Sequence, residues 1–94
     1  MRAFAIFQTD QANRHLTTLC HHFGRKVEAR CDAGRAQIVF AFGQCDLAAT
    51  DQQLELSAQA EDKARLDVVV DVVTRHLERF AFRENPQLDW HPAE

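Results

Sequence analysis

Hydrophobic and polar residues alternate through the middle of the chain. Every second residue is apolar from Val27 to Cys31 and again across 53–59. A strand points successive side chains to opposite faces, so this alternation predicts strands with one buried face. Segments 38–42 and 45–49 carry apolar residues at alternate positions too, and 38–42 is also apolar on its other side. We therefore predict a four-stranded antiparallel meander over 27–59, with a turn at 32–35.

An amphipathic helix is predicted to precede the meander, over 10–24. Its apolar stripe recurs with the helical period through Ala12, Leu16, Leu19 and Phe23. Thr9 and Asp10 offer side-chain oxygens as an N-cap. Gly24 follows the last stripe residue, where we expect a left-handed conformation to end the helix.

A second helix is predicted after the meander. Pro86 disfavours helix at Asn85, so this helix should stop near 81–84. Leu88 and Trp90 alternate around a polar residue and predict a short extended segment, followed by a tail from about residue 91. The stripe of the second helix runs through Leu66, Val69, Val70, Val73, Leu77 and Phe80.

Residues 3–8, rich in Phe and Ile, predict a first strand buried on both faces. The order is therefore strand, helix, four strands, helix. Because each helix has one apolar stripe and the meander has one apolar face, both helices must cover the same face of the sheet. The expected fold class is α+β, two helices on one face of a curved antiparallel sheet, as in TATA-binding-protein-like or helix-grip folds. That comparison carries no implication for function.

Composition and charge narrow the function classes. The 94 residues are 46 % hydrophobic and 27 % charged, which predicts one globular domain over 1–94. Eleven basic and fourteen acidic side chains give a net charge of −3, so we expect no nucleic-acid partner. Neither a secretory signal nor a membrane-spanning stretch is visible, which predicts a soluble cytoplasmic protein without a membrane partner.

Three cysteines lack any metal-binding spacing. Cys31 and Cys45 are expected at opposite ends of the strand between them, too far apart for a disulfide. We interpret all three as small buried hydrophobes in a reducing compartment, with a reactive thiol at Cys20 as the alternative.

The histidines are the first candidate site. His15 and His22 flank the apolar stripe of the first helix, His76 flanks that of the second, and His21 points to solvent. If the helices lie side by side, His22 and His76 converge at the seam between them. Two imidazoles there can bind a transition metal or titrate near neutral pH. The alternative is that their rings simply pack and form hydrogen bonds with backbone or water.

An arginine row at the end of the second helix is the second candidate. Arg75, Arg79 and Arg83 recur every four residues beside Phe82, which leaves the main stripe. Guanidinium groups bind carboxylate or phosphate, so this row can dock a small anionic ligand or an acidic partner. The alternative is a solvated face neutralised by the nearby acidic residues Asp71, Glu78 and Glu84.

The outer sheet face is the third candidate. Val39, Ala41 and Ala48, together with Ala5 and Phe7, would form an apolar patch there. Such a patch predicts a partner surface, most simply for a homodimer. In the alternative, the C-terminal segment with Leu88 and Trp90 covers it.

Three segments carry a family resemblance: 19–23 (Leu-Cys-His-His-Phe), 34–43 (ending Phe-Ala-Phe-Gly) and 76–84 (His-Leu-Glu-Arg-Phe-Ala-Phe-Arg-Glu). Together they resemble a small bacterial family known only as domain of unknown function 2218. The likeness extends from about Thr9 to Trp90, and the 76–84 segment is its most specific part.

Family members carry Leu-Cys-Lys-His-Phe followed by a second histidine and a lysine. His22 and Lys26 match, whereas Arg25 replaces the second histidine and Ala41 stands where proline is common. Some relatives are encoded beside, or fused to, siderophore-interacting flavin reductases. The resemblance thus implies an accessory role in iron or siderophore handling. Carried over residue by residue, it points to His22, His76, Arg79, Phe82 and Arg83.

No Gly-rich phosphate loop, nucleophile elbow or HExxH helix is present, and the carboxylates are scattered over expected wet faces. We therefore expect a non-enzymatic binding or accessory domain without a cofactor. Its ligand is expected to be a small anion at the seam between the helices and the arginine row beside it, or, as the resemblance implies, a siderophore-related partner. The first alternative is a small enzyme or metal-binding module that uses His22 and His76. The second is a structural domain for homo-oligomerisation.

Overall fold

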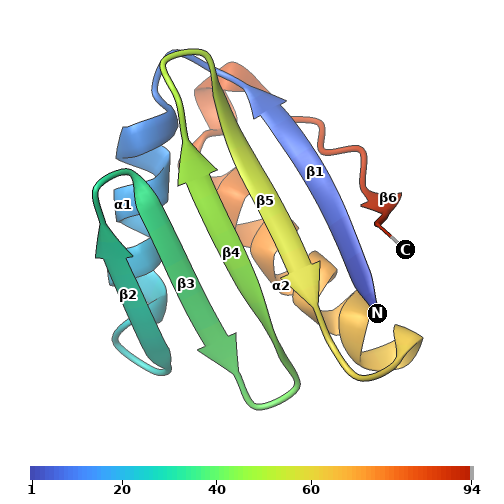
Figure 1. Cartoon of the computed structure of the whole chain (residues 1–94). Helices are drawn as coiled ribbons and strands as arrows, with labels where there is room; N and C mark the ends of the chain where they lie inside the picture. The colour runs from blue at the N-terminus through green and yellow to red at the C-terminus, as the bar shows by residue number, and fades with distance from the viewer. Residues whose placement is uncertain (94) are drawn as a thin grey trace.

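The alternating segments form one antiparallel sheet (Figure 1). The computed structural model describes residues 1–93. In chain order the elements are β1 (Arg2–Gln8), α1 (Ala12–Phe23), β2 (Glu28–Asp32), β3 (Arg35–Phe40), β4 (Gly43–Ala49), β5 (Gln53–Gln59), α2 (Lys63–Phe80), the 3-10 helix η1 (Phe82–Glu84) and β6 (His91–Pro92).

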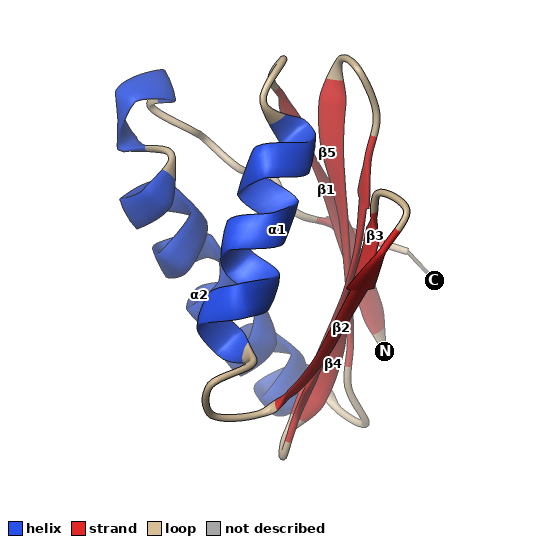
Figure 2. Ribbon diagram, turned by 90° about the vertical axis from the view of Figure 1, so that its left-hand side faces the viewer, coloured by secondary structure: helices blue, strands red, loops and turns tan. Residues whose placement is uncertain are grey.

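The strand order is β2-β3-β4-β5-β1-β6, and every neighbouring pair is antiparallel. The N-terminal strand therefore extends the sheet beyond the last strand of the meander. Both helices lie on the same side of the sheet, and the opposite side is free of helices (Figure 2). This arrangement confirms the predicted α+β class and the predicted placement of the helices.

Strand β1 corrects the expectation that the first strand is buried on both faces. Its burial alternates: Ala3, Ala5 and Phe7 point toward the helices and are buried, whereas Phe4 and Ile6 are exposed. The physical reason is that helices cover only one face of the sheet. Apolar residues on the other face have no partner layer within residues 1–93.

The core fills the space between the inward face of the sheet and the two helical stripes. Each large aliphatic side chain buried there contributes roughly 1.5–3 kcal/mol relative to exposure. None of the helices in residues 1–93 is long and apolar enough to cross a membrane. The side chains buried most completely are Leu16, Leu19, Ile38, Cys45, Leu54, Leu56, Val69, Val73 and Leu77.

The ends of α1 differ from the predicted caps. Gln11 is the N-cap and makes no capping hydrogen bond through its side chain. The Thr9 hydroxyl instead accepts from the backbone N–H of Gln11 at 3.0 Å, so it orders the turn before the helix. Gly24 has φ −61°, a right-handed conformation, and its N–H donates to the carbonyl oxygen of Cys20 at 2.9 Å. The helix therefore unwinds through a further turn rather than a left-handed glycine.

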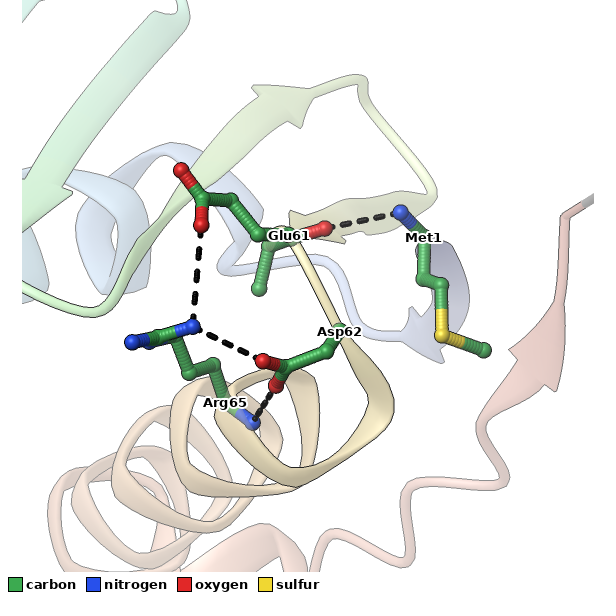
Figure 3. Close-up of polar contacts among 5 residues, drawn as sticks. Met1, Glu61, Asp62 and Arg65 are labelled. Carbon is green, nitrogen blue, oxygen red and sulfur yellow. Dashed lines mark hydrogen bonds and ion pairs between the residues drawn. The ribbon is translucent and has the colours of Figure 1, made fainter.

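The start of α2 is tied to the beginning of the chain (Figure 3). The Asp62 carboxylate caps the helix by accepting from the backbone N–H of Arg65 at 2.8 Å, and it also pairs with the Arg65 guanidinium at 2.7 Å. Glu61 lies 3.6 Å from the same guanidinium. The terminal ammonium of Met1 donates to the carbonyl oxygen of Ala60 at 2.7 Å. These contacts attach the start of α2 to the N-terminus of the chain.

The chain reverses after α2, which ends at Phe80, one residue before the predicted stop near 81–84, and the separate helix η1 continues to Glu84. Asn85 adopts a left-handed conformation with φ 49° and closes η1. Pro86 is buried. The indole Nε1 of Trp90 then donates to the Thr74 hydroxyl of α2 at 2.9 Å.

The segment with Leu88 and Trp90 therefore packs beside α2 instead of covering the outer sheet face. The expected tail also proves partly ordered, since His91 and Pro92 form β6 against β1. Glu94, the end of that tail, lies outside the described residues.

Gly43, the first residue of β4, lies where the end of the sheet packs close against α2. A Cβ atom there would lie 2.5 Å from the backbone oxygen of Gln59 and 2.8 Å from a methyl group of Val69. We predict that Gly43→Ala lowers the free energy of unfolding by about 1–3 kcal/mol through this overlap. Chemical denaturation would measure the change. A variant as stable as the wild type would contradict the close approach.

Candidate functional site

The two helices meet along a seam, and the structure brings the rings of His22 and His76 together there. Their ring centroids lie 4.9 Å apart. His22 also contacts the ring of Phe80 at 5.2 Å, and His76 contacts that of Phe23 at 4.6 Å. The pair is thus half-buried in an aromatic cluster that both helices supply.

The tautomer of His76 follows from its backbone contact. Its Nδ1 lies 2.6 Å from the carbonyl oxygen of Val72, one turn earlier in α2. A carbonyl oxygen only accepts, so Nδ1 carries the proton and donates it. When His76 is neutral, its Nε2 keeps a free lone pair. The ring is therefore oriented as well as placed.

Burial is the main cause that lowers the pKa of His22, because the charged imidazolium loses hydration in the seam. The neighbouring His76 adds to the effect, and so do the positive charges of Arg25, Lys26 and Arg79. His22 is consequently neutral at pH 7. A neutral imidazole offers the lone pair of one ring nitrogen.

A second polar cluster lies further along the seam, where η1 meets α1. His15 is buried, and its Nε2 lies 2.5 Å from one carboxylate oxygen of Glu84. The Thr9 hydroxyl donates to the other oxygen. The Thr9 hydrogen bond is the main cause that holds the pKa of Glu84 below its ordinary value, and His15 contributes. Both carboxylate oxygens of Glu84 are thereby hydrogen-bonded, while the residue itself stays exposed at the surface.

Nothing in the sequence pattern indicated this cluster. Glu84 is exposed, as the solvated-face alternative had it, but no perturbed carboxylate was expected, and the pKa of Glu84 is lowered by Thr9 and His15. The correction arises because the helix ends at Phe80 and the chain turns, which directs Glu84 toward α1. The partners lie 69 and 75 positions away in the sequence, so periodicity carries no signal for them.

A cavity of about 440 Å³ opens beside the cluster, between α1 and the turn that follows α2. Arg14 of α1 and Arg83 of η1 both line it. The Arg83 guanidinium lies over the Phe82 ring, 5.8 Å from its centroid. Within residues 1–93 neither arginine forms an ion pair, and the adjacent carboxylate of Glu84 is bound to Thr9 and His15. We call this cavity the arginine pocket; its lining is Gln11, Arg14, His15, Thr18, Phe80, Ala81, Phe82, Arg83 and Glu84.

The predicted site residues therefore divide into two groups. Phe82 and Arg83 lie in the arginine pocket, whereas His22 and His76 form the histidine pair. Arg79 is exposed and acts electrostatically on His22 without lining the pocket.

The predicted arginine row is broken. Arg75 pairs with Asp71 at 3.3 Å, and Arg83 leaves the row because α2 ends before it. Arg14, on the opposite helix, supplies the second cation of the pocket instead. Its exposed position on α1 gave no sign of this in the sequence.

The cysteines correct a further expectation. Cys20 and Cys45 are buried, but Cys31 is exposed on the edge strand β2. Burial raises the pKa of Cys20 to about 12, and a hydrogen bond with the Cys31 side chain adds to this. Burial likewise raises the pKa of Cys45 to about 12. Thiols with such pKa values are poor nucleophiles, which disfavours the alternative of a reactive Cys20.

The outer sheet face differs in detail from the expected patch. Ala5 and Phe7 point into the core, and Ala41 lies in the turn between β3 and β4. The exposed large apolar side chains of this face are Phe4 and Ile6, 40 % and 45 % exposed. The exposed apolar surface that could form a homodimer therefore lies on β1, and the homodimer itself stays a prediction.

A sheet with both helices on one face and a polar seam between them defines a two-layer α+β domain. A family model described as an uncharacterized protein conserved in bacteria (DUF2218) matches residues 4–91. The chain belongs to this family, as the resemblance predicted.

The solved NMR structure of PA4090 from Pseudomonas aeruginosa is similar over its full length. It shares 31 % sequence identity with a TM-score of 0.84, and the match covers 99 % of this chain and 97 % of that one. No curated protein matches the chain. The comparisons thus establish the family and the fold.

We predict that Glu84→Gln lowers the free energy of unfolding at pH 7 by about 1 kcal/mol, because the hydrogen bonds to a charged acceptor are lost. The pKa of Glu84 is lower in the folded state, so its contribution is present above about pH 4.5 and is lost as pH falls through the folded pKa. Denaturation between pH 7 and pH 3 should show a weaker acid dependence in the variant. Glu78→Gln, an exposed position on α2, is the control; an equal effect there would contradict the role of Glu84.

Burial lowers the pKa of His22 by disfavouring its charged form, whereas hydrogen bonds lower the pKa of Glu84 by favouring its charged form. Both shifts make the folded protein less stable as the pH falls. Below the ordinary histidine pKa of about 6.5, the unfolded chain binds more protons than the folded one, so stability falls as pH drops toward the folded pKa. We predict that His76→Gln raises the NMR titration midpoint of His22, because one source of positive charge is removed. His21→Gln should leave the midpoint unchanged. A midpoint unaffected by His76→Gln would contradict the coupling of the two rings.

Proposed function

We propose that this chain is a non-enzymatic binding domain that holds a small anionic ligand in the arginine pocket. The observation that carries the proposal is the charge pattern of the pocket. Two arginines from different elements, Arg14 and Arg83, line one cavity, and Glu84, the one acidic residue among the described lining, accepts hydrogen bonds from Thr9 and His15. An anion entering the pocket would gain two charge-assisted partners without displacing an existing ion pair.

The pocket is built to keep this geometry. Arg83 rests against the Phe82 ring, and η1 is attached to α1 through Glu84, Thr9 and His15. A ligand that contacts both arginines would bridge α1 and η1. A volume of about 440 Å³ suits a molecule of a few carboxylate, phosphate or phenolate groups.

The siderophore setting that the resemblance implies is part of the proposal. Hydroxycarboxylate and catecholate groups, which chelate iron, carry the negative charge that guanidinium groups recognise. An accessory domain of this kind would hold such a chelator or its iron complex. A homodimer through the face around Phe4 and Ile6 would leave the arginine pocket open, because the pocket lies on the helical side of the sheet.

Catalysis by His22 and His76 is a weaker alternative. Within residues 1–93 neither ring is paired with a carboxylate that would orient it as a general base. The Nδ1 proton of His76 is donated to a backbone carbonyl. These features favour ligand binding over acid–base chemistry.

Titration with citrate, inorganic phosphate, 2,3-dihydroxybenzoate and ferric citrate, followed by NMR, tests the proposal. We predict saturable shifts of the backbone signals of Arg14, Thr18 and Phe82 with at least one probe. Arg14→Gln and Arg83→Gln should each weaken binding by on the order of tenfold, about 1.4 kcal/mol.

Arg75→Gln is the matched control, since it removes the same charge from the exposed face of α2. Equal weakening by all three variants would mean that the anion senses only the general charge and would overturn the pocket. Shifts with phosphate alone would overturn the siderophore setting and leave the anion site intact.

A further inference from the structure

The histidine pair lies outside the arginine pocket and needs its own explanation. Its rings come from two helices, which a folded chain can bring together for packing alone. Three features go beyond packing: the separation of the rings, the orientation of His76 and the chemical nature of the surroundings.

The separation fits two imidazoles that share one ion. Metal–nitrogen bonds of ~2.0–2.1 Å at a tetrahedral angle place the two ring centres about 5 Å apart. The observed centroid separation of His22 and His76 is 4.9 Å, with an interplanar angle of 47°. The lone pairs of imidazole nitrogens lie in the ring planes, so two parallel stacked rings could not direct them at one ion. The two rings are tilted rather than parallel, so their planes intersect.

The orientation of His76 is that of a metal ligand with a second-shell partner. Histidines that bind metals commonly donate their other ring nitrogen to a carbonyl or carboxylate, which fixes the ring and makes it more basic. The Val72 carbonyl has this role for Nδ1 of His76. The unprotonated Nε2 of His76 is then the nitrogen whose lone pair can bind a metal ion.

We propose that His22 and His76 form a two-histidine site for a transition-metal ion that prefers imidazole, such as Zn²⁺ or Cu²⁺. The lowered pKa of His22 supports this, since a neutral ring is the form that binds metal. Iron(III) fits poorly, because it prefers oxygen ligands and no carboxylate is paired with either ring within residues 1–93.

Within the described residues, no group of three or more His, Cys, Asp or Glu side chains is placed to hold a metal ion. The remaining coordination positions therefore belong to water or to an added ligand. Arg25, Lys26 and Arg79 place positive charge near His22, which weakens the attraction of a cation. The same charges favour an anionic ligand in the open positions. The site thus suits an ion that carries a bound anion.

The test uses the full chain without a histidine tag, stripped of metal. Zn²⁺ and Cu²⁺ are titrated separately at pH 7.4 against a chromophoric competitor, and imidazole nitrogen signals are followed by NMR for Zn²⁺. We predict one ion per chain and a large shift of Nε2 of His76, while its Nδ1 keeps the proton.

His22→Gln and His76→Gln should each reduce the affinity at least tenfold, with folding verified by circular dichroism. His21→Gln, the exposed neighbour, should leave the affinity unchanged. Equal weakening by His21→Gln, or binding that survives both His22→Gln and His76→Gln, would show that the metal binds adventitiously at the surface and would overturn the proposal. The absence of saturable binding would overturn it as well. Arg14→Gln should leave metal binding intact, so failure of the metal site and failure of the arginine pocket are distinguishable.

Discussion

One-sided burial of the sheet is the constraint on which the rest of the structure depends. Alternate residues of β1, β3, β4 and β5 are buried under helices, and the residues between them face away from both helices. Two helices with one apolar stripe each can bury those stripes only on the same face. They must then lie side by side, and the residues that flank their stripes must meet. The fold alone therefore brings the flanks of α1 and α2 together at the seam, whatever the seam binds.

What the seam contains is set by how α2 ends. A straight continuation of the helix would carry Arg83 and Glu84 along its surface. The turn after Phe80 instead brings Glu84 against Thr9 and His15, where its charge is satisfied internally. Arg83 is left beside the cavity with Arg14, and within residues 1–93 neither forms an ion pair. A chain with a net negative charge thus has a local positive pocket.

The sequence predicted the parts of the fold that depend on periodicity. Leu66, Val73 and Leu77 identified the buried side of α2, and Leu54 and Leu56 that of β5. The convergence of His22 and His76 followed from the same reasoning, because both flank a stripe.

Periodicity failed where the chain changes direction or where one layer is missing. It placed Phe7 on the wrong face of the sheet, since a run of apolar residues does not show which face lacks a cover. It also gave no sign of the contact between His15 and Glu84, which depends on the turn of the chain after Phe80. Contacts across so long a stretch of chain are decided by tertiary packing.

The central claim is that α1 and α2 meet with these polar side chains in fixed contact. Nuclear Overhauser effects between the ring protons of His22 and His76, together with the hydrogen-exchange rate of the His15 Nε2 proton, measure this directly. The account predicts strong ring-to-ring effects and a slowly exchanging His15 Nε2 proton, which His15 donates to the Glu84 carboxylate. Absent effects and a rapidly exchanging proton would show that the seam is open to water, and the account would be wrong.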